Sequence, residues 1–387
     1  MLCPLATGLA LGAAAVVGCG APAPADAFLV AMAEGERAYS AGRYAEAAES
    51  YHRAAALGDR VKDRDEALFL EARLYLKLGR VSDAVATYRR LVSVSPEGPR
   101  TVRAIFELAT IEIEHGDAAR GWAALEAAVR RYPNHGSARK ALSEVVGHKV
   151  ETEGESAARR FLEQVQPGFE GTEAAQQGRY ELGLSLERSG ELPRARDLFL
   201  GLARAYPYPL GNLTDDAYWH AALIDEQLGH YQEAVAELRE MLAPQETGIT
   251  GASYDRPRFP SAQWRMAKIY RDEIKDPAAA RREFHRMYEK HPDTAVADDA
   301  LWQEALLARR AKDDADVCGL MKLLRDHYPK SRYLRCVDRL CPGEKPTDTE
   351  RGCPPYIERT VSGETVDVTD AEPADKEGAD ALDGGAD

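Results

Sequence analysis

Small and apolar residues recur three and four positions apart along most of the chain, which is the pattern of amphipathic helices. Phe69, Ala72 and Leu76 share one helix face, and Ala84 and Leu91 share a second face a few residues later. A short turn between two such stretches lets their apolar faces pack together. The pattern therefore predicts helix hairpins, and the many Ala, Leu, Glu and Arg residues favour helix throughout.

Glycines mark the turns of these hairpins at a regular interval. Gly42, Gly79 and Gly116 lie 37 residues apart, and Gly190 lies twice that distance further on. A weaker copy of the motif is expected midway, where Gly154 lies. Glycine suits the left-handed residue that ends a helix, and proline cannot continue a helix. Prolines mark the ends of the units independently, at Pro96, Pro133, Pro207, Pro292 and Pro329.

The repeated unit resembles the tetratricopeptide repeat. We count eight units in the array at residues 28–341, with a loop insertion at residues 245–260. The resemblance implies an all-α fold, an α-solenoid of about eight antiparallel helix hairpins that form a right-handed superhelix. It also implies a concave groove, lined by the first helices, for extended peptides or partner helices. The fifth unit carries the family pattern at Leu182, Gly183, Leu186, Gly190, Leu192, Ala195, Phe199, Leu202 and Pro207.

The fifth position of the first helix is aromatic in five units. In the family this position borders the concave face, so these rings would anchor a partner. The alternative is that each ring packs between helices, which we favour for any single residue because the family uses aromatics there for packing as well. The candidate groove residues are Phe69, Phe106, Tyr180, Trp219 and Trp302.

The insertion at residues 245–260 separates the sixth and seventh units. Long loops inside a compact array are uncommon and often functional. A partner-binding loop and a disordered insertion fit the sequence equally well. If the loop binds a partner, we expect its contacting residues to be Tyr254, Arg256, Arg258 and Phe259.

The charge of the chain restricts the classes of partner that it can bind. The formal net charge is −14, and the segment 360–387 alone has nine acidic residues and one basic residue. An acidic chain without a basic block is unsuited to nucleic acid, which needs clustered Lys and Arg. The tail at residues 360–387 lacks aromatic residues and is expected to be disordered. No HExxH, P-loop, GxSxG or dinucleotide motif occurs, so we predict neither catalysis nor a cofactor.

The first residues are predicted to be a processing signal. Residues 5–17 form an uncharged apolar run that is too short to span a bilayer and that leads into Gly18 and Cys19. The run resembles the lipobox of bacterial lipoproteins, although residues 1–4 lack the usual basic residue; an ordinary secretory signal is the alternative. The resemblance implies a signal peptide at 1–18, acylation of Cys19, a flexible tether at 19–27, and membrane attachment by the lipid alone.

Four further cysteines lie close together in the last third of the chain. An even set in an exported protein predicts disulfides, for which three connectivities exist. We prefer Cys318–Cys336, which joins consecutive helices, and Cys341–Cys353, which closes a disulfide-linked segment at residues 342–359. Zinc is the alternative, but no histidine lies near the last three cysteines and the spacings do not match paired CxxC motifs. We therefore predict no metal site.

Together, these features resemble periplasmic tetratricopeptide lipoproteins of the BamD and CpoB type. The resemblance implies a protein-binding scaffold, anchored in the outer membrane and facing the periplasm, whose partners are other envelope proteins. Outer-membrane protein assembly is the most specific role it suggests. An accessory or pilot lipoprotein for secretion, pilus or motility machinery is one alternative. A cell-wall binding factor that recruits a peptidoglycan enzyme is another.

Overall fold

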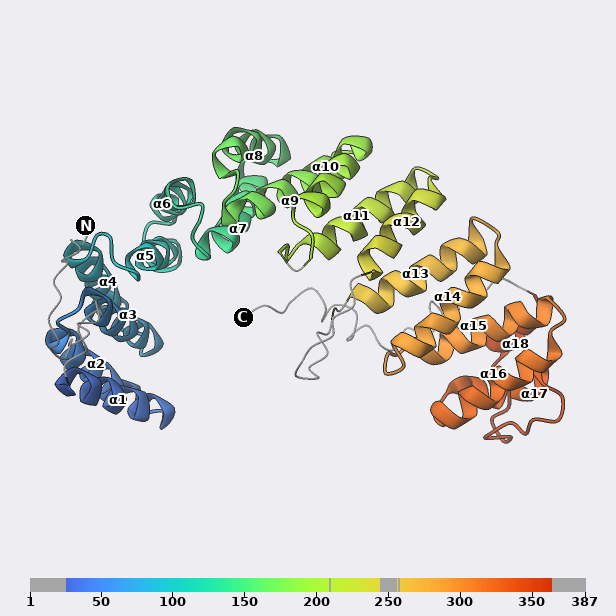
Figure 1. Cartoon of the computed structure of the whole chain (residues 1–387). Coiled ribbons are helices and arrows are strands. Elements are labelled where there is room, and N and C mark those ends of the chain that lie inside the picture. The colour runs from blue at the N-terminus through green and yellow to red at the C-terminus, as the bar shows by residue number, and fades with distance from the viewer. Residues whose placement is uncertain (1–25, 209, 244–255, 257, 364–387) are drawn as a thin grey trace, which may run out of the picture. The chain divides into compact units, whose positions relative to one another are not determined.

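The computed structural model describes residues 26–208, 210–243, 256 and 258–363. These residues form eighteen α-helices and one 3₁₀ helix, with no strand among them, so the predicted all-α class is confirmed (Figure 1). The chain divides into two compact units, Met1–Val145 and Val146–Asp387, and the boundary falls inside the helix α7. None of the helices in these segments is both long and apolar enough to cross a bilayer.

Sixteen of the helices pair in sequence into eight hairpins, as predicted. A short connection between the two helices of each pair reverses the direction of the chain. The hairpins are α1 Asp26–Ser40 with α2 Tyr44–Leu57, α3 Val61–Lys77 with α4 Val81–Val94, α5 Thr101–His115 with α6 Ala118–Arg131, α7 Ser137–Glu153 with α8 Glu155–Phe169, α9 Glu173–Arg188 with α10 Leu192–Ala205, α11 Thr214–Gln227 with α12 Tyr231–Leu242, α13 Arg258–Asp272 with α14 Pro277–Lys290, and α15 Ala297–Arg310 with α16 Asp314–His327.

In seven of the eight hairpins the turn contains one residue in the left-handed region. Gly79 has φ +71°, and the other glycines from which the period was read, Gly116 excepted, adopt similar values. In the last two hairpins a lysine takes this position, since Lys275 and Lys312 both have φ +61°. These two lysines are 37 residues apart, so the period continues where the glycine marker is lost.

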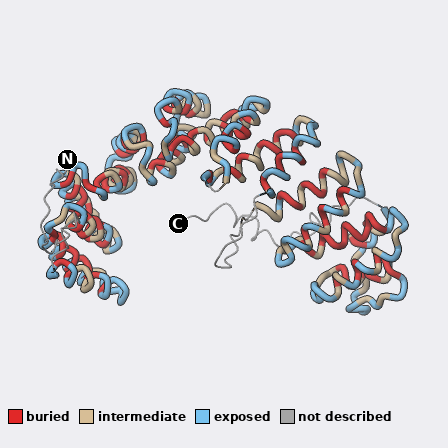
Figure 2. The backbone as a smooth tube through the Cα atoms, viewed as in Figure 1, coloured by how far each residue is buried: buried red, intermediate tan, exposed pale blue. Residues whose placement is uncertain are grey.

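Small residues let the two helices of a hairpin approach closely. Gly183 on α9 faces Phe199 on α10, and a Cβ at this glycine would lie 2.6 Å from Phe199 Cε1. Ala84 and Ala195, at the equivalent place in two second helices, are fully buried. Within each unit the buried residues follow the helix sides that face neighbouring helices (Figure 2). Close packing along these stripes is what holds the hairpins together.

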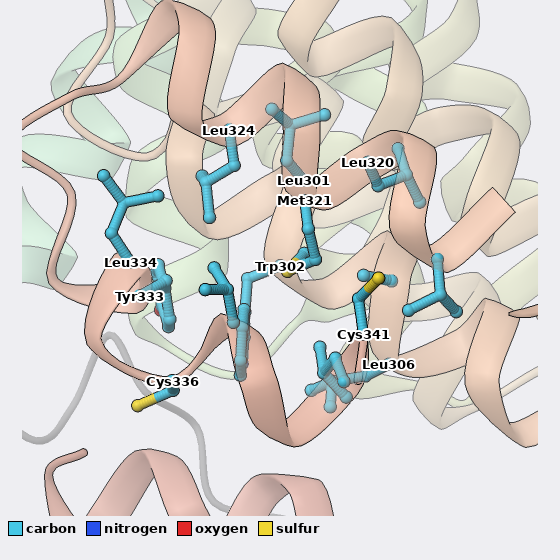
Figure 3. Close-up of a cluster of buried hydrophobic side chains, with 14 of the residues drawn as sticks. Leu301, Trp302, Leu306, Leu320, Met321, Leu324, Tyr333, Leu334, Cys336 and Cys341 are labelled. Carbon is cyan, nitrogen blue, oxygen red and sulfur yellow. The ribbon is translucent and has the colours of Figure 1, made fainter. Parts of the chain in front are cut away.

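The eighth hairpin is covered by the segment that follows it. A 3₁₀ helix, Arg332–Arg335, and two short helices, α17 Val337–Leu340 and α18 Pro355–Ser362, lie against α15 and α16. Trp302 of α15 is fully buried, stacks on Tyr333 with ring centroids 4.7 Å apart, and donates its indole N–H to Thr360 at 3.3 Å (Figure 3). We call residues 332–362 the C-terminal cap.

Two disulfides fix the cap, and their pairing differs from the preferred prediction. Cys318 of α16 is bonded to Cys341, and Cys336 to Cys353, with Cα–Cα distances of 5.2 and 4.9 Å. Cys336 and Cys341 flank the single turn of α17, and a five-residue step along a helix turns the side chain by roughly 140°. The two sulfurs therefore point to opposite sides of α17, one toward α16 and the other toward the start of α18.

Two predicted boundaries are also corrected. Residues 258–260 belong to α13 and not to the inserted loop, and Phe259 among them packs in the core cluster that includes Ala222 of α11. The cap helix α18 runs to Ser362 and buries Thr360, so the predicted tail starts too early. The signal segment with Cys19, the loop residue Tyr254 and the acidic residues from Glu364 onward lie outside the described residues.

Candidate functional site

Three of the five predicted groove aromatics are core residues. Phe69, Phe106 and Trp302 are 1%, 5% and 0% exposed, so their rings are almost wholly covered by the chain itself, although Phe106 borders a groove that is described below. Phe69 packs against Tyr88 of the same hairpin with centroids 5.6 Å apart. For these three positions the groove prediction is wrong, and packing between helices explains the aromatic preference.

Tyr180 is half-buried and joins two neighbouring first helices. Its hydroxyl lies 3.1 Å from His220 Nε2, and His220 Nδ1 lies 2.8 Å from a carboxylate oxygen of Glu187. His220 also stacks on Phe199 at 5.0 Å. Burial raises the pKa of the Tyr180 hydroxyl, so the hydroxyl stays protonated within this hydrogen-bonded chain. This chain of hydrogen bonds fixes α9 against α11, which is a structural role.

Trp219 lines a groove between the first helices α11 and α13. The groove has a volume of about 540 Å³, and Trp264 and Ile269 of α13 lie along it with Trp219. Trp219 and Trp264 are both half-buried, so part of each ring faces the groove. The remaining lining residues are Glu226, Pro260, Ser261, Arg265, Lys268, Asp272, Glu273 and Val296.

Charged side chains in and beside this groove are held by ion pairs. Arg265 donates to Glu226 at 2.7 Å, and its guanidinium lies 5.6 Å from the centroid of the Trp219 ring. Arg258 pairs with Asp216 and lies 5.9 Å from the same ring. Cation–π contacts of this kind stabilise the ring orientation by about 0.5–1 kcal/mol at exposed sites. The groove thus has fixed aromatic walls before any partner binds.

Trp264 was missed by the sequence analysis. It lies 28 residues before Pro292, whereas Trp302 lies 27 residues before Pro329, so Trp264 is one position off the predicted aromatic column. The seventh hairpin also lacks the glycine from which the column could have been counted. The Trp264 ring packs edge-on against Phe284 of α14, with centroids 5.2 Å apart. Counting 27 residues back from Pro292 leads to Arg265, so the repeat spacing alone does not find Trp264.

The predicted loop contacts turn inward and not toward a partner. Arg256 pairs with Asp215 at the first turn of α11, and its guanidinium lies 4.4 Å from the ring of Tyr208 and 4.3 Å from that of Phe259. Burial raises the pKa of Asp215 in spite of the lowering by Arg256. Together with the Arg258–Asp216 pair, these contacts bind the end of the insertion to α11. Arg256, Arg258 and Phe259 are therefore used within the chain.

A second groove of about 540 Å³ lies in the first unit, between α5 and the start of α7. His135 lines this groove and stacks on the Phe106 ring, with ring centroids 5.7 Å apart. Arg103 and Glu107 pair at 3.6 Å on one wall, and Lys140 lies 3.8 Å from a carboxylate oxygen of Glu144 on the other. Burial lowers the pKa of His135 and raises that of Glu144.

One strongly perturbed carboxyl group, that of Glu237, lies inside the helix packing and away from both grooves. Asp225 is fully buried between Arg196 and Glu237, and burial raises the pKa of Glu237 to about 8. No group of three or more His, Cys, Asp or Glu residues in the described ranges could hold a metal ion. The grooves offer aromatic surface and fixed charges, which suit the binding of a polypeptide segment.

Comparison with known families agrees with the hairpin architecture. A tetratricopeptide-repeat family matches residues 32–99 and 152–208, and a second tetratricopeptide-repeat family matches residues 261–294. The matched segments fall on hairpins of both units. No curated protein matches the chain.

Solved tetratricopeptide structures are similar at low identity. A tetratricopeptide repeat protein from Parabacteroides merdae is 14% identical, over 72% of this chain and 99% of that chain, with a TM-score of 0.35. The C-terminal part of such a protein from Cytophaga hutchinsonii is 15% identical, over 71% and 99%, with a TM-score of 0.43. PilW, a type IV pilus biogenesis factor, is 16% identical, over 62% and 98%, with a TM-score of 0.36.

Proposed function

We propose that this chain, as a tetratricopeptide-repeat protein, is a scaffold that holds an extended segment of a partner protein in the α11–α13 groove. Repeats of this kind generally form non-catalytic scaffolds that bind peptides or proteins in a groove. The observation that carries the proposal is the pair of half-buried tryptophans, Trp219 and Trp264, on the two sides of that groove. Tryptophan is among the residues that dominate binding energy at protein interfaces.

We further propose that the partner is a protein of the bacterial cell envelope. The apolar run that ends at Cys19 supports a lipid anchor in the outer membrane, with the repeats facing the periplasm. The two disulfides of the cap support the same location, because disulfides persist in oxidising compartments. Assembly of outer-membrane proteins remains the most specific role that fits this location.

Crosslinking from the groove tests the scaffold proposal. A photoreactive amino acid at the exposed groove residue Ser261 should give one discrete adduct with an envelope protein, and the same group at Leu210 should not. Adding W219A and W264A should reduce the Ser261 adduct at least tenfold, about 1.4 kcal/mol or more of binding energy.

The matched control is Trp122→Ala, which removes an equally large, half-buried ring from α6 in the other unit. This control should leave the adduct unchanged. Equal yields from the groove variants and from Trp122→Ala would contradict the assignment of the groove. Mass spectrometry of the mature N-terminus tests the anchor separately, since an unmodified Cys19 would refute it.

A further inference from the structure

Exposed large hydrophobic side chains are concentrated at one place in the first unit. Seven such side chains occur in the described residues, and six of them belong to the first two hairpins. Tyr39 lies at the end of α1 beside the Gly42 turn, and the other five lie near the helix ends at the opposite side of the hairpins. Each of the five is 41–57% exposed. These residues are Leu29 and Val30 near the start of α1, Leu57 at the end of α2, Val61 at the start of α3 and Val94 at the end of α4.

The antiparallel order of the helices brings these five side chains to the same end of the stack. First helices begin where second helices end, and the turns at Gly42 and Gly79 lie at the opposite end. Phe28 at the start of α1 is buried in one cluster with Ala55 near the end of α2 and with Leu68 of α3. We call Leu29, Val30, Leu57, Val61 and Val94 the apolar edge.

Repeat geometry does not require an apolar edge. The second helices of the third, seventh and eighth hairpins end in Arg131, Lys290 and His327, where α2 and α4 end in Leu57 and Val94. Likewise α5, α7 and α9 begin with Thr101, Ser137 and Glu173, where α3 begins with Val61. Where the fourth hairpin has the apolar Phe169 at the end of its second helix, the ring is buried. Among the described helices, exposed large apolar side chains at helix ends therefore occur only in the first two hairpins.

The charges beside the apolar edge are balanced. Lys62, Arg89 and Arg90 are exposed there, and so are Asp26, Asp59 and Glu97. A surface with no net charge gains little from an oppositely charged partner, so the binding energy must come from apolar contact. Such a surface fits the interface of a lipid bilayer, where isolated Leu and Val side chains enter the boundary between headgroups and acyl chains.

The stretch between Cys19 and α1 is short. Cys19 precedes Asp26 by seven residues, and seven extended residues span at most about 25 Å. A lipid on Cys19 would therefore keep the start of α1, and the apolar edge beside it, close to the membrane that holds the lipid. We propose that the apolar edge lies on the bilayer surface and orients the first two hairpins there. The inference rests on the proposed envelope location but not on the partner-binding groove.

Vesicle binding of the mature chain without its lipid tests the proposal. A chain beginning at Gly20 keeps every described residue and lacks Cys19, so its binding reports the protein surface and not the anchor. We expect measurable co-sedimentation with vesicles of phosphatidylethanolamine and phosphatidylglycerol. Affinity should change less than threefold when phosphatidylcholine replaces both lipids, because the edge carries no net charge.

Paired variants locate the surface. V61D combined with V94D should reduce the partition coefficient at least tenfold, and L29S combined with V30S should reduce it in the same direction. Leu210→Asp is the matched control, since Leu210 is the most exposed large hydrophobic in the described residues and lies in the other unit, at 77% exposure. This control should change partition less than twofold, and circular dichroism should confirm that all variants keep their helix content.

Three outcomes would overturn the proposal. The first is equal loss of binding with Leu210→Asp, and the second is no binding of the lipid-free chain to either vesicle. The third is a dimer in sedimentation analysis without vesicles that V61D and V94D dissociate, because the edge would then be an interface between two copies. None of these results depends on crosslinking from the groove or on acylation of Cys19, so failure here and failure of the proposed function are distinguishable.

Discussion

The first and last hairpins share one plan but differ in how much of the first helix they bury. Helix α15 buries eleven of its fourteen residues, whereas α1 buries four of its fifteen. The difference comes from what covers each helix. α15 packs against α14, α16 and the C-terminal cap, and within its unit α1 packs mainly against α2. Burial in a repeat array is thus set by neighbours and not by the repeat sequence alone.

The largest effect is expected where the cap meets the last hairpin. Trp302→Ala should lower the free energy of unfolding of this end by about 3–5 kcal/mol, because it empties a fully buried site beneath Tyr333. Leu29→Ala at the other end should change stability by less than about 0.5 kcal/mol, because the side chain is already exposed. Denaturant unfolding followed by hydrogen exchange measures both, and similar losses would contradict the comparison.

Removing one disulfide should give the next largest effect. Replacing Cys336 and Cys353 by alanine should lower the stability of the cap by about 2–4 kcal/mol, because the loop that the bond closes gains freedom when unfolded. Hydrogen exchange should then accelerate in α18 and remain unchanged in α1 to α4. Uniform acceleration along the chain would mean that the cap does not unfold by itself.

The pH dependence of stability should also differ between the two ends of the repeat array. Glu304 of α15 is buried beside His285, and burial raises its pKa to about 7. Because the folded pKa lies above the unfolded value near 4.3, the folded state binds the extra proton, and stability falls as pH rises from about 4.5 to 7.

We expect the free energy of unfolding at the C-terminal end to fall by about 1–3 kcal/mol between about pH 4.5 and pH 7. Glu304→Gln should remove most of it. The control is Glu34→Gln on α1, where the carboxylate forms an exposed pair with Arg53 worth at most about 1 kcal/mol. Unfolding measured at several pH values would contradict the prediction if Glu304→Gln kept the wild-type slope.

The smallest effect concerns the hairpin turns. Lys312→Gly in the last hairpin should stabilise the chain by roughly 0.5–1 kcal/mol, because glycine adopts φ +61° without strain. Gly42→Ala in the first hairpin, at φ +74°, should destabilise it by a similar amount. Thermal unfolding of the two variants measures both changes in stability. If both changes had the same sign, the turn residues would not set local stability.

The hairpins were predictable because periodicity is local. Spacing from Gly42 to Gly116 and the closing prolines yielded all eight units, since each hairpin packs mainly on its neighbours in sequence. Groove residues were harder to predict because exposure depends on what a neighbouring helix covers. Phe69 and Trp219 occupy the same repeat position, yet Phe69 is buried and Trp219 is half-buried beside a groove.

The cap shows a second limit of prediction from the sequence. Four cysteines allowed three pairings, and the choice depended on the single turn of α17, which no periodic signal marks. Trp264 escaped for a related reason, because it lies one residue before the aromatic column, at which the seventh hairpin has Arg265. Sequence patterns identify elements that repeat, and they fail where one residue or one turn departs from the repeat.

The cap also has a consequence for how this chain can change in length over evolution. Tyr333 occupies the face of Trp302, and the Cys318–Cys341 disulfide ties the cap to α16, where a ninth hairpin would have to stack. Duplication of a hairpin at that end would displace the cap and separate Cys341 from Cys318. New repeats are therefore accommodated only ahead of the eighth hairpin, so the cap fixes one terminus of the array while its length remains free to vary elsewhere.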